Sequence, residues 1–226
     1  MPPTTSGVLE MQQKNTTADT LTTRQQAIPL IATSMAVGNM EKLNAALNLG
    51  LDAGLTVNET KEILVQLYAY TGFPRSLNAL AELMKVVEAR KARGINDAQG
   101  KEPATPVPVG DELRRVGTVN QTTISGAPVQ GPLFDFAPVI NQFLQTHLFG
   151  DIFARDSLDW QSRELATVGA LAAMPGVESQ LLAHLKASLR VGLSAGQLRQ
   201  LTQGLRDNGD ADAAARAEKA LAQAQN

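Results

Sequence analysis

The chain of 226 residues contains no cysteine. This absence excludes disulfides, thiol catalysis and zinc sites with thiolate ligands. No apolar run approaches the roughly 18 residues that a membrane-spanning helix needs, and the opening stretch MPPTTSGVLEMQQKN lacks the apolar core of a secretion signal. We therefore expect no membrane partner and a cytoplasmic location, with the periplasm as the alternative if a signal peptide has been removed.

Charge and aromatic residues are also scarce. The formal net charge is -2, 19% of the residues are charged and 4% are aromatic. A net charge so close to zero does not indicate the basic surface that binding to nucleic acid requires. The sequence has no phosphate loop, nucleophile elbow, dinucleotide fingerprint or histidine pair at metal-ligand spacing, so we expect no metal and no cofactor. The abundance of Ala and Leu favours helices over sheets, which predicts an all-α protein.

Composition divides the chain into four segments. Residues 1–19 are polar and rich in threonine, which indicates a loose N-terminal arm. Residues 20–93 have a helical pattern throughout, in which Pro29 is expected to kink or delay the first helix. Residues 94–138 are rich in Pro and Gly, which predicts an ordered linker without helix. The helical pattern resumes over residues 139–226.

The linker also carries apolar residues. Leu133, Phe134 and Phe136 make this stretch too apolar for a solvated tether. We therefore expect the linker to pack across the helices.

The second helical segment repeats features of the first. Leu47–Leu64 aligns with Leu185–Thr202, and Leu21–Gln25 aligns with Trp160–Glu164 one gap away. Thr56 and Glu59 have the spacing of a capping box, and Ser194 and Gln197 repeat that spacing. A tandem duplication of a helical unit is the simplest interpretation, and coincidental similarity of two amphipathic helix pairs is the alternative.

An acidic residue and one of only two histidines lie on consecutive helix-like runs. Glu164 lies on the first run and His184 on the second, and Pro175–Gly176 separates them. We predict that the two side chains face each other across this turn and border an apolar pocket, where histidine is a natural proton donor. The alternatives are a helix-start charge or Arg163 partner for Glu164, and a satisfied core residue for His184.

Further polar and aromatic residues are candidates for binding a substrate. Arg163, Arg190 and Arg75 are candidates for holding a carboxylate with two hydrogen bonds, although each is also typical of a structural ion pair. Gln66 lies one turn before Tyr70, so both are expected to face one cavity. Trp160, the only tryptophan, is a candidate substrate contact or a core residue.

Three stretches of the sequence resemble the carboxymuconolactone decarboxylase family. LYAYTGFPRSLNAL (Leu67–Leu80) is similar to the signature Tyr-Ala-Gly-Phe-Pro-x-x-x-Asn-Ala. HLFGDIFARDSLDWQSREL (His147–Leu165) resembles the segment that leads into the first core helix of the family. HLKASLRVGLSAGQL (His184–Leu198) matches a His-x-x-x-x-x-x-x-Gly-Leu-Thr/Ser helix end. The resemblance extends from about Thr20 to Asn226.

The resemblance implies a tandem duplicated, all-helical fold of the alkylhydroperoxidase D-like type. It places a catalytic Glu on Glu164 and a catalytic His on His184, while the cysteine positions of the peroxidase members fall at about Gly176 and Ser179. The thiol peroxidase activity of the family is therefore expected to be lost. The first repeat, with Gln25 and Ala46 at the corresponding positions, is expected to hold no such pair.

Two functions remain from the sequence. The first is a decarboxylase-like lyase that uses cofactor-free acid–base chemistry on a small carboxylated lactone or related ring compound, with Glu164 and His184 as catalytic residues and Arg163, Trp160, Gln66 and Tyr70 as substrate-binding residues. The second is a non-catalytic helical oligomer that acts as a binding or structural module. Because single-repeat members of the family assemble as rings of six, we expect a homotrimer of two-repeat chains.

Overall fold

The computed structural model of the protein describes residues 19–226, and this part is helical with no β-strand. The predicted all-α class is therefore confirmed. The arm expected over residues 1–19 lies outside the described residues, apart from Asp19. None of the helices in the described part is both long enough and apolar enough to cross a membrane.

The helices follow one another with short connections, except for one long loop after α6. Their bounds are α2 (Thr23–Ala36), α3 (Met40–Asp52), α4 (Val57–Gln66), α5 (Tyr68–Thr71), α6 (Phe73–Ala92), α7 (Gly110–Ser125), α8 (Pro132–Phe136), α9 (Pro138–Phe143), the π-helix η1 (Leu144–Ile152), α10 (Trp160–Ala173), α11 (Glu178–Arg190), α12 (Ala195–Asp207) and α13 (Ala211–Ala224).

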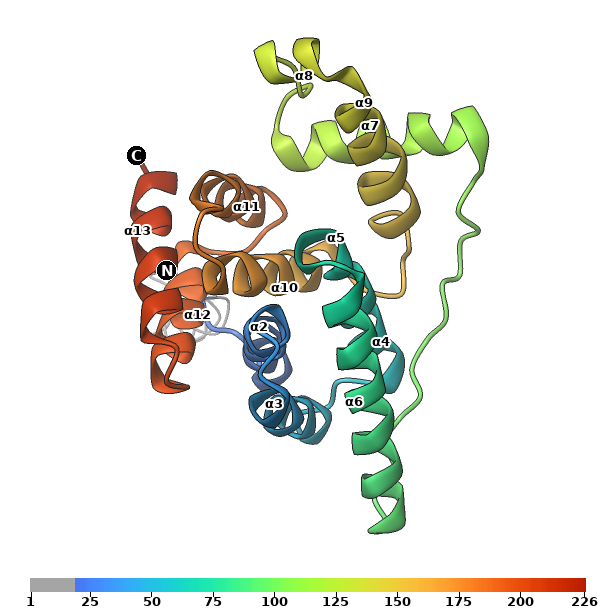
Figure 1. The fold of residues 1–226 in the computed structure, drawn as a ribbon, viewed down its shortest axis with the longest axis vertical. Helices are drawn as coiled ribbons and strands as arrows, with labels where there is room; N and C mark the ends of the chain where they lie inside the picture. Colours follow the sequence, from blue (N-terminus) through green and yellow to red (C-terminus); the bar gives the residue numbers. More distant parts are fainter. Residues whose placement is uncertain (1–18) are drawn as a thin grey trace, which may run out of the picture.

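The core is built around α2 and α10, which pack against each other near the middle of the molecule (Figure 1). Their backbones approach closely at Gly169, where a Cβ atom would lie 2.8 Å from the Pro29 carbonyl oxygen. The Thr33 hydroxyl donates a hydrogen bond of 3.0 Å to the Gly169 carbonyl at the same crossing. Helix α3 packs on α2, and α11 packs on α10, so each central helix has a partner from its own half of the chain.

Side-chain caps fix the starts of several helices. The capping boxes predicted at Thr56–Glu59 and Ser194–Gln197 are both present. A further box at Thr22 and Gln25 starts α2 at Thr23. Because this cap sets the start, Pro29 does not delay α2 and lies inside it.

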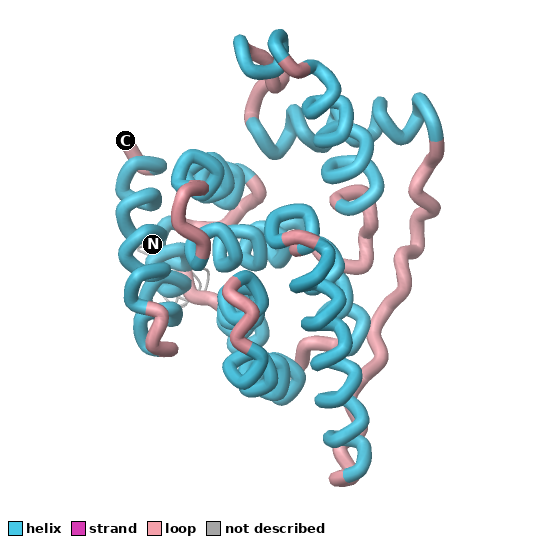
Figure 2. The backbone as a smooth tube through the Cα atoms, in the orientation of Figure 1, coloured by secondary structure: helices cyan, strands magenta, loops and turns pink. Residues whose placement is uncertain are grey.

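The Pro/Gly-rich segment contains a long helix, which corrects the prediction of a linker without helix. Helix α7 takes up Gly110–Ser125, with Asp111 and Glu112 in its first turn, where carboxylates favour the positive end of the helix dipole. Its buried residues Leu113, Gly117, Gln121 and Ile124 have the spacing of one helix face. The parts without helix are the loop from Arg93 to Val109, drawn in pink along one side of Figure 2, and the shorter loop over residues 126–131.

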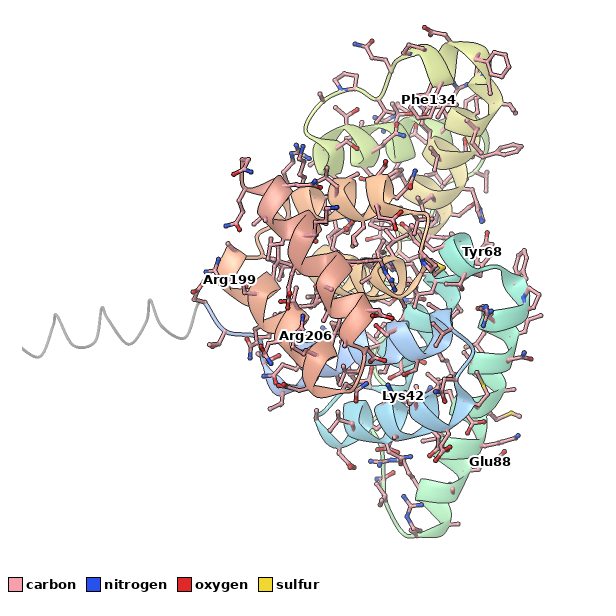
Figure 3. The ribbon with its side chains drawn as sticks, turned by 60° about the vertical axis from the view of Figure 1, so that its left-hand side comes forward. Lys42, Tyr68, Glu88, Phe134, Arg199 and Arg206 are labelled. Atoms are coloured by element: carbon pink, nitrogen blue, oxygen red, sulfur yellow. The ribbon has the colours of Figure 1, made fainter. Side chains whose placement is uncertain are left out.

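Helices α7, α8, α9 and η1 form a unit that projects from the other helices (Figure 1). Helix α7 packs directly on η1. Their backbones approach so closely at Gly117 that a Cβ atom there would lie only 1.7 Å from the Gln145 carbonyl oxygen. The apolar residues of α8 do not pack across the core helices as expected, since Leu133 is 63% and Phe136 is 89% exposed. Phe134 lies on the same projecting unit, far from Lys42 on α3 (Figure 3).

Candidate functional site

Glu164 and His184 form a hydrogen-bonded pair between α10 and α11. Asp159 caps α10 by accepting a hydrogen bond of 2.7 Å from the Ser162 amide, which places Glu164 one turn into the helix. Glu164 Oε2 lies 2.8 Å from His184 Nδ1. We assign the proton of this contact to Nδ1, because a carboxylate only accepts hydrogen bonds. The Pro175–Gly176 turn between the helices brings the two residues together, as the sequence led us to expect.

The two members of the pair differ in exposure. The Glu164 side chain is completely buried, whereas the His184 side chain is 16% exposed. No described residue forms a hydrogen bond with His184 Nε2. The buried carboxylate therefore orients the ring from one side and leaves Nε2 as the nitrogen available for proton transfer.

His184 borders a cleft of about 300 Å³ between α11, the end of α7 and η1. Ile124, Phe149 and Leu182 supply apolar walls. Lys186 and Arg190 supply two exposed cationic groups on the same helix as His184. The cleft therefore combines a proton-transfer group with charges that attract a carboxylate.

Tyr70 packs against the same pair from α5. Its ring lies edge-on to the His184 ring, with centroids 5.6 Å apart and an interplanar angle of 85°. Burial and the nearby Glu164 carboxylate raise the pKa of the Tyr70 hydroxyl far above its usual range, so the phenol stays protonated. The sequence grouped Tyr70 with a substrate cavity, but Tyr70 contacts the edge of the His184 ring and does not line this cleft.

Arg163 and Gln66 belong to a buried polar network and do not line the cleft. Arg163 Nη1 donates to Gln66 Oε1 at 3.0 Å, and Gln66 Nε2 donates to Thr167 Oγ1 at 2.8 Å. Arg163 Nη2 also donates to Glu62 Oε2 at 3.2 Å. Both Arg163 and Gln66 have no exposed surface, and the hydrogen bonds between them join α4 to α10, although Arg163 Nε has no partner among the described residues. This placement gives both residues a structural role in the site.

Glu62 holds the charge of this network. Burial alone would raise the pKa of Glu62, but hydrogen bonds from Arg155 and the charges of Arg163 and Arg155 outweigh it, and the net pKa is lowered. Burial lowers the pKa of the Arg163 guanidinium, while Glu62 opposes that change. The Glu62 carboxylate therefore compensates the buried positive charge of Arg163.

Trp160 borders a different cleft. Its Nε1 donates a hydrogen bond of 3.0 Å to the Phe153 carbonyl, and its side chain lines a hollow with Arg155 and Asp159. Arg75, a further sequence candidate, lies against the Gly38 turn. Neither residue lines the His184 cleft.

The second histidine makes a separate, exposed cluster. His147 Nδ1 lies 2.8 Å from Asp151 Oδ2, and His147 Nε2 contacts the Tyr68 hydroxyl. The His147 side chain is 48% exposed. The molecule thus contains a buried and an exposed set of tyrosine, histidine and carboxylate, and the exposed set is a natural internal control for the buried one.

Some cleft residues were not foreseen. Ile124 and Phe149 come from α7 and η1, and Lys186 lies two residues after His184. The helical spacing of the buried α7 positions was a signal that was present in the sequence. The sequence also suggested Gln25 as the counterpart of Glu164, but Gln25 is the third residue of α2 and closes its capping box, whereas Glu164 is the fifth residue of α10. Ala27 is the fifth residue of α2.

Comparison with known families gives one match. Residues 138–225 match the sequence model of the Carboxymuconolactone decarboxylase family. The match covers less than half of the chain but includes α9 to α13 and both Glu164 and His184. No curated protein matches the chain. The C-terminal part, which carries the Glu–His pair, is thus similar to the Carboxymuconolactone decarboxylase family.

Proposed function

We propose that the protein is a carboxymuconolactone decarboxylase-like enzyme that acts without a cofactor on a small carboxylated lactone or a related ring compound. One observation carries the proposal: the buried Glu164 carboxylate holds His184 Nδ1 at 2.8 Å, and His184 borders a cleft that Lys186 and Arg190 also line. The arrangement joins a proton-transfer group to cations that bind carboxylates. The family match over the same residues supports it.

The proposed reaction is a decarboxylation followed by protonation at carbon. Arg190 and Lys186 bind a carboxylate that the product retains. The carbon–carbon bond to the second carboxylate breaks, CO₂ leaves, and the electron pair passes into the lactone as an extended enolate. Protonated His184 then delivers the proton from Nε2 to carbon, and solvent returns a proton to the ring. Glu164 stabilises the imidazolium before transfer and fixes its orientation.

The walls of the cleft serve the same step. Ile124, Phe149 and Leu182 surround the histidine with apolar surface. Apolar walls limit the access of water to an enolate and strengthen the contact between Glu164 and His184. The thiol route used by peroxidase members is closed, because the chain has no cysteine.

The test is turnover of γ-carboxymuconolactone by the pure protein and its variants. We expect His184→Ala and Glu164→Gln each to lower kcat by about 10²-fold or more with the fold retained. The double variant is expected to be little slower than the slower single variant, because both residues serve one proton transfer.

His147→Ala is the matched control, since it removes the other histidine from an exposed position. We expect its activity to equal that of the unaltered protein. If neither this lactone nor related carboxylated lactones are turned over or raise the thermal stability of the protein, the structural module is the better interpretation.

We also propose that the chain arose by duplication and assembles as a homotrimer. Helices α2 and α10 each have 14 residues, and α3 and α11 each have 13. The loops before α4 and α12 end in capping boxes at corresponding positions. Three two-unit chains are equivalent to a ring of six single units.

A further inference from the structure

Two buried polar atoms beside the Glu–His pair have no hydrogen-bond partner. They are Glu164 Oε1 and the Tyr70 hydroxyl. Each unsatisfied buried group costs free energy, and most buried polar groups in folded proteins are paired. Ser157 Oγ and Arg163 Nε are also buried without a partner in the described part of the chain, but Glu164 and Tyr70 are the two residues of this set that contact His184.

The chemistry of the two atoms is complementary. Glu164 Oε1 is an acceptor, since the other oxygen of the carboxylate accepts from His184. The raised pKa of Tyr70 keeps the phenol protonated. Burial is the larger cause of this shift and the negative charge of Glu164 is the second, so the two groups are close enough to interact electrostatically. Thr167 also lies beside the phenol and lowers the pKa of Tyr70, against the larger effects of burial and Glu164. The Thr167 hydroxyl accepts from Gln66 and donates to the Arg163 carbonyl, and the Tyr70 hydroxyl forms no hydrogen bond with it.

The position of the Tyr70 ring adds a second restraint. The ring stands edge-on against the imidazole, 5.6 Å between centroids. An edge contact of this kind limits how far His184 can turn. Tyr70 therefore acts on both members of the pair, through its hydroxyl on Glu164 and through its ring on His184.

We propose that Tyr70 is a positioning residue of the proposed active site, whose hydroxyl donates to Glu164 Oε1 after a modest rotation of the two side chains. This bond satisfies both buried atoms at once. It fixes the carboxylate so that Oε2 stays on His184 Nδ1, and it leaves Nε2 toward the cleft. The inference rests on the proposed function only for its effect on turnover.

With Tyr70 as a positioning residue, the first half of the chain contributes a side chain to the proposed active site. Tyr70 belongs to α5, whereas Glu164 and His184 belong to α10 and α11. Residues 138–225, which match the family, lack this residue. The site is complete only when the two halves pack together.

The experiment compares Tyr70→Phe with Tyr68→Phe in the full chain. Both variants remove one hydroxyl from α5 and keep the ring, but Tyr68 contacts His147 instead of His184. Because the chain has only two histidines, ¹⁵N NMR of the side chains resolves the tautomer of each one in one spectrum.

We expect His184 of the unaltered protein to be protonated at Nδ1 in its neutral form. In Tyr70→Phe the Nδ1–H population of His184 decreases while the His147 signals stay unchanged, and Tyr68→Phe leaves His184 unchanged. With γ-carboxymuconolactone, Tyr70→Phe lowers kcat by about 5- to 10-fold, the effect of one lost hydrogen bond, and leaves KM within about twofold.

A Tyr70→Phe spectrum in which the His184 nitrogens are identical to those of the unaltered protein overturns the inference. A KM increase with unchanged kcat also overturns it, because that result belongs to a substrate contact. If the tautomer changes but no lactone is turned over, the positioning role stands and the proposed function fails.

Discussion

At the scale of single residues, the contact between Glu62 and Arg163 joins the two halves by a buried ion pair. Arg163 has no exposed surface and Glu62 is 7% exposed. Arg155 also forms a salt bridge of 2.5 Å with Glu62. The residue next to this network along α10 is Glu164, so the network fixes the first turns of the helix that carries the pair.

We predict that Glu62→Gln destabilises the protein by about 3–5 kcal/mol, because it leaves the Arg163 charge buried without a counter-charge. The pKa of Glu62 is lower in the folded protein than in the unfolded chain. The contribution of Glu62 to stability is therefore complete above its unfolded pKa and is lost as the pH falls through its folded pKa. Urea denaturation at several pH values between 3 and 7 measures both effects. The difference between the two proteins is expected to shrink toward acid pH.

Glu112→Gln is the matched control for this prediction. Glu112 also pairs with an arginine, Arg115, but both side chains are more than half exposed. Exposed pairs contribute little to stability, so we expect no measurable change. Equal losses in the two variants would contradict the account of the buried network.

The sequence was informative about the pair and less informative about its surroundings. Glu164 and His184 are separated by a Pro-Gly turn, so their contact follows from local chain geometry. Whether Arg163 faces a cleft or Glu62 depends on how α4 packs on α10. The contacts that fix this packing join residues 97 or more positions apart in the chain. No local pattern contains that information.

At the scale of helices, the close approach of α2 and α10 depends on glycine. A Cβ atom at Gly169 would lie 2.8 Å from the Pro29 carbonyl oxygen and 2.9 Å from its Cα, and both are backbone atoms that cannot turn away. The helices must separate to accept any side chain there. Overpacking of this kind typically costs about 1–3 kcal/mol.

We predict that Gly169→Ala lowers the free energy of unfolding by this amount and that Gly204→Ala raises it. Gly204 also lies inside a helix, α12, but no atom lies within 4 Å of a Cβ at that position. Alanine is favoured over glycine in a helix by up to about 1 kcal/mol. Urea denaturation of the two variants checks the opposite signs, and a stabilising Gly169→Ala would show that α2 and α10 are not tightly packed.

Helix α7 differs in composition from the stretches on either side of it. Prolines and glycines are concentrated before Gly110 and after Ser125, and they set the character of the whole segment. The intervening sixteen residues contain no proline and form the helix. The spacing of Leu113, Gly117 and Ile124 predicts this helix better than the average composition does.

At the scale of the whole molecule, the projecting unit exposes a large amount of apolar surface. Leu133, Phe136 and Phe143 are each more than 60% exposed, and Val139 and Ile140 lie between them in the chain. Large exposed apolar side chains concentrated in one short segment are typical of contacts between proteins. It supports the proposal that the chain assembles with copies of itself.

We predict that light scattering at micromolar concentration gives three times the chain mass of 24.0 kDa. Phe136→Glu places a charge on the exposed surface of α8 and is expected to reduce that mass. Glu88→Gln, a change on the distant helix α6 (Figure 3), is the control and is expected to leave it unchanged. A monomer for the unaltered protein would contradict the trimer.

The central claim is that His184 meets a carboxylated ligand in the cleft beside Lys186 and Arg190. Its most direct test is ¹⁵N NMR of the two histidines during titration with a lactone acetic acid that lacks the labile carboxyl group and is therefore not consumed. We predict that the His184 nitrogens shift and saturate while those of His147 do not move, and that Arg190→Ala weakens the binding. Unchanged His184 nitrogens at saturating ligand, or equal shifts at both histidines, would contradict the claim.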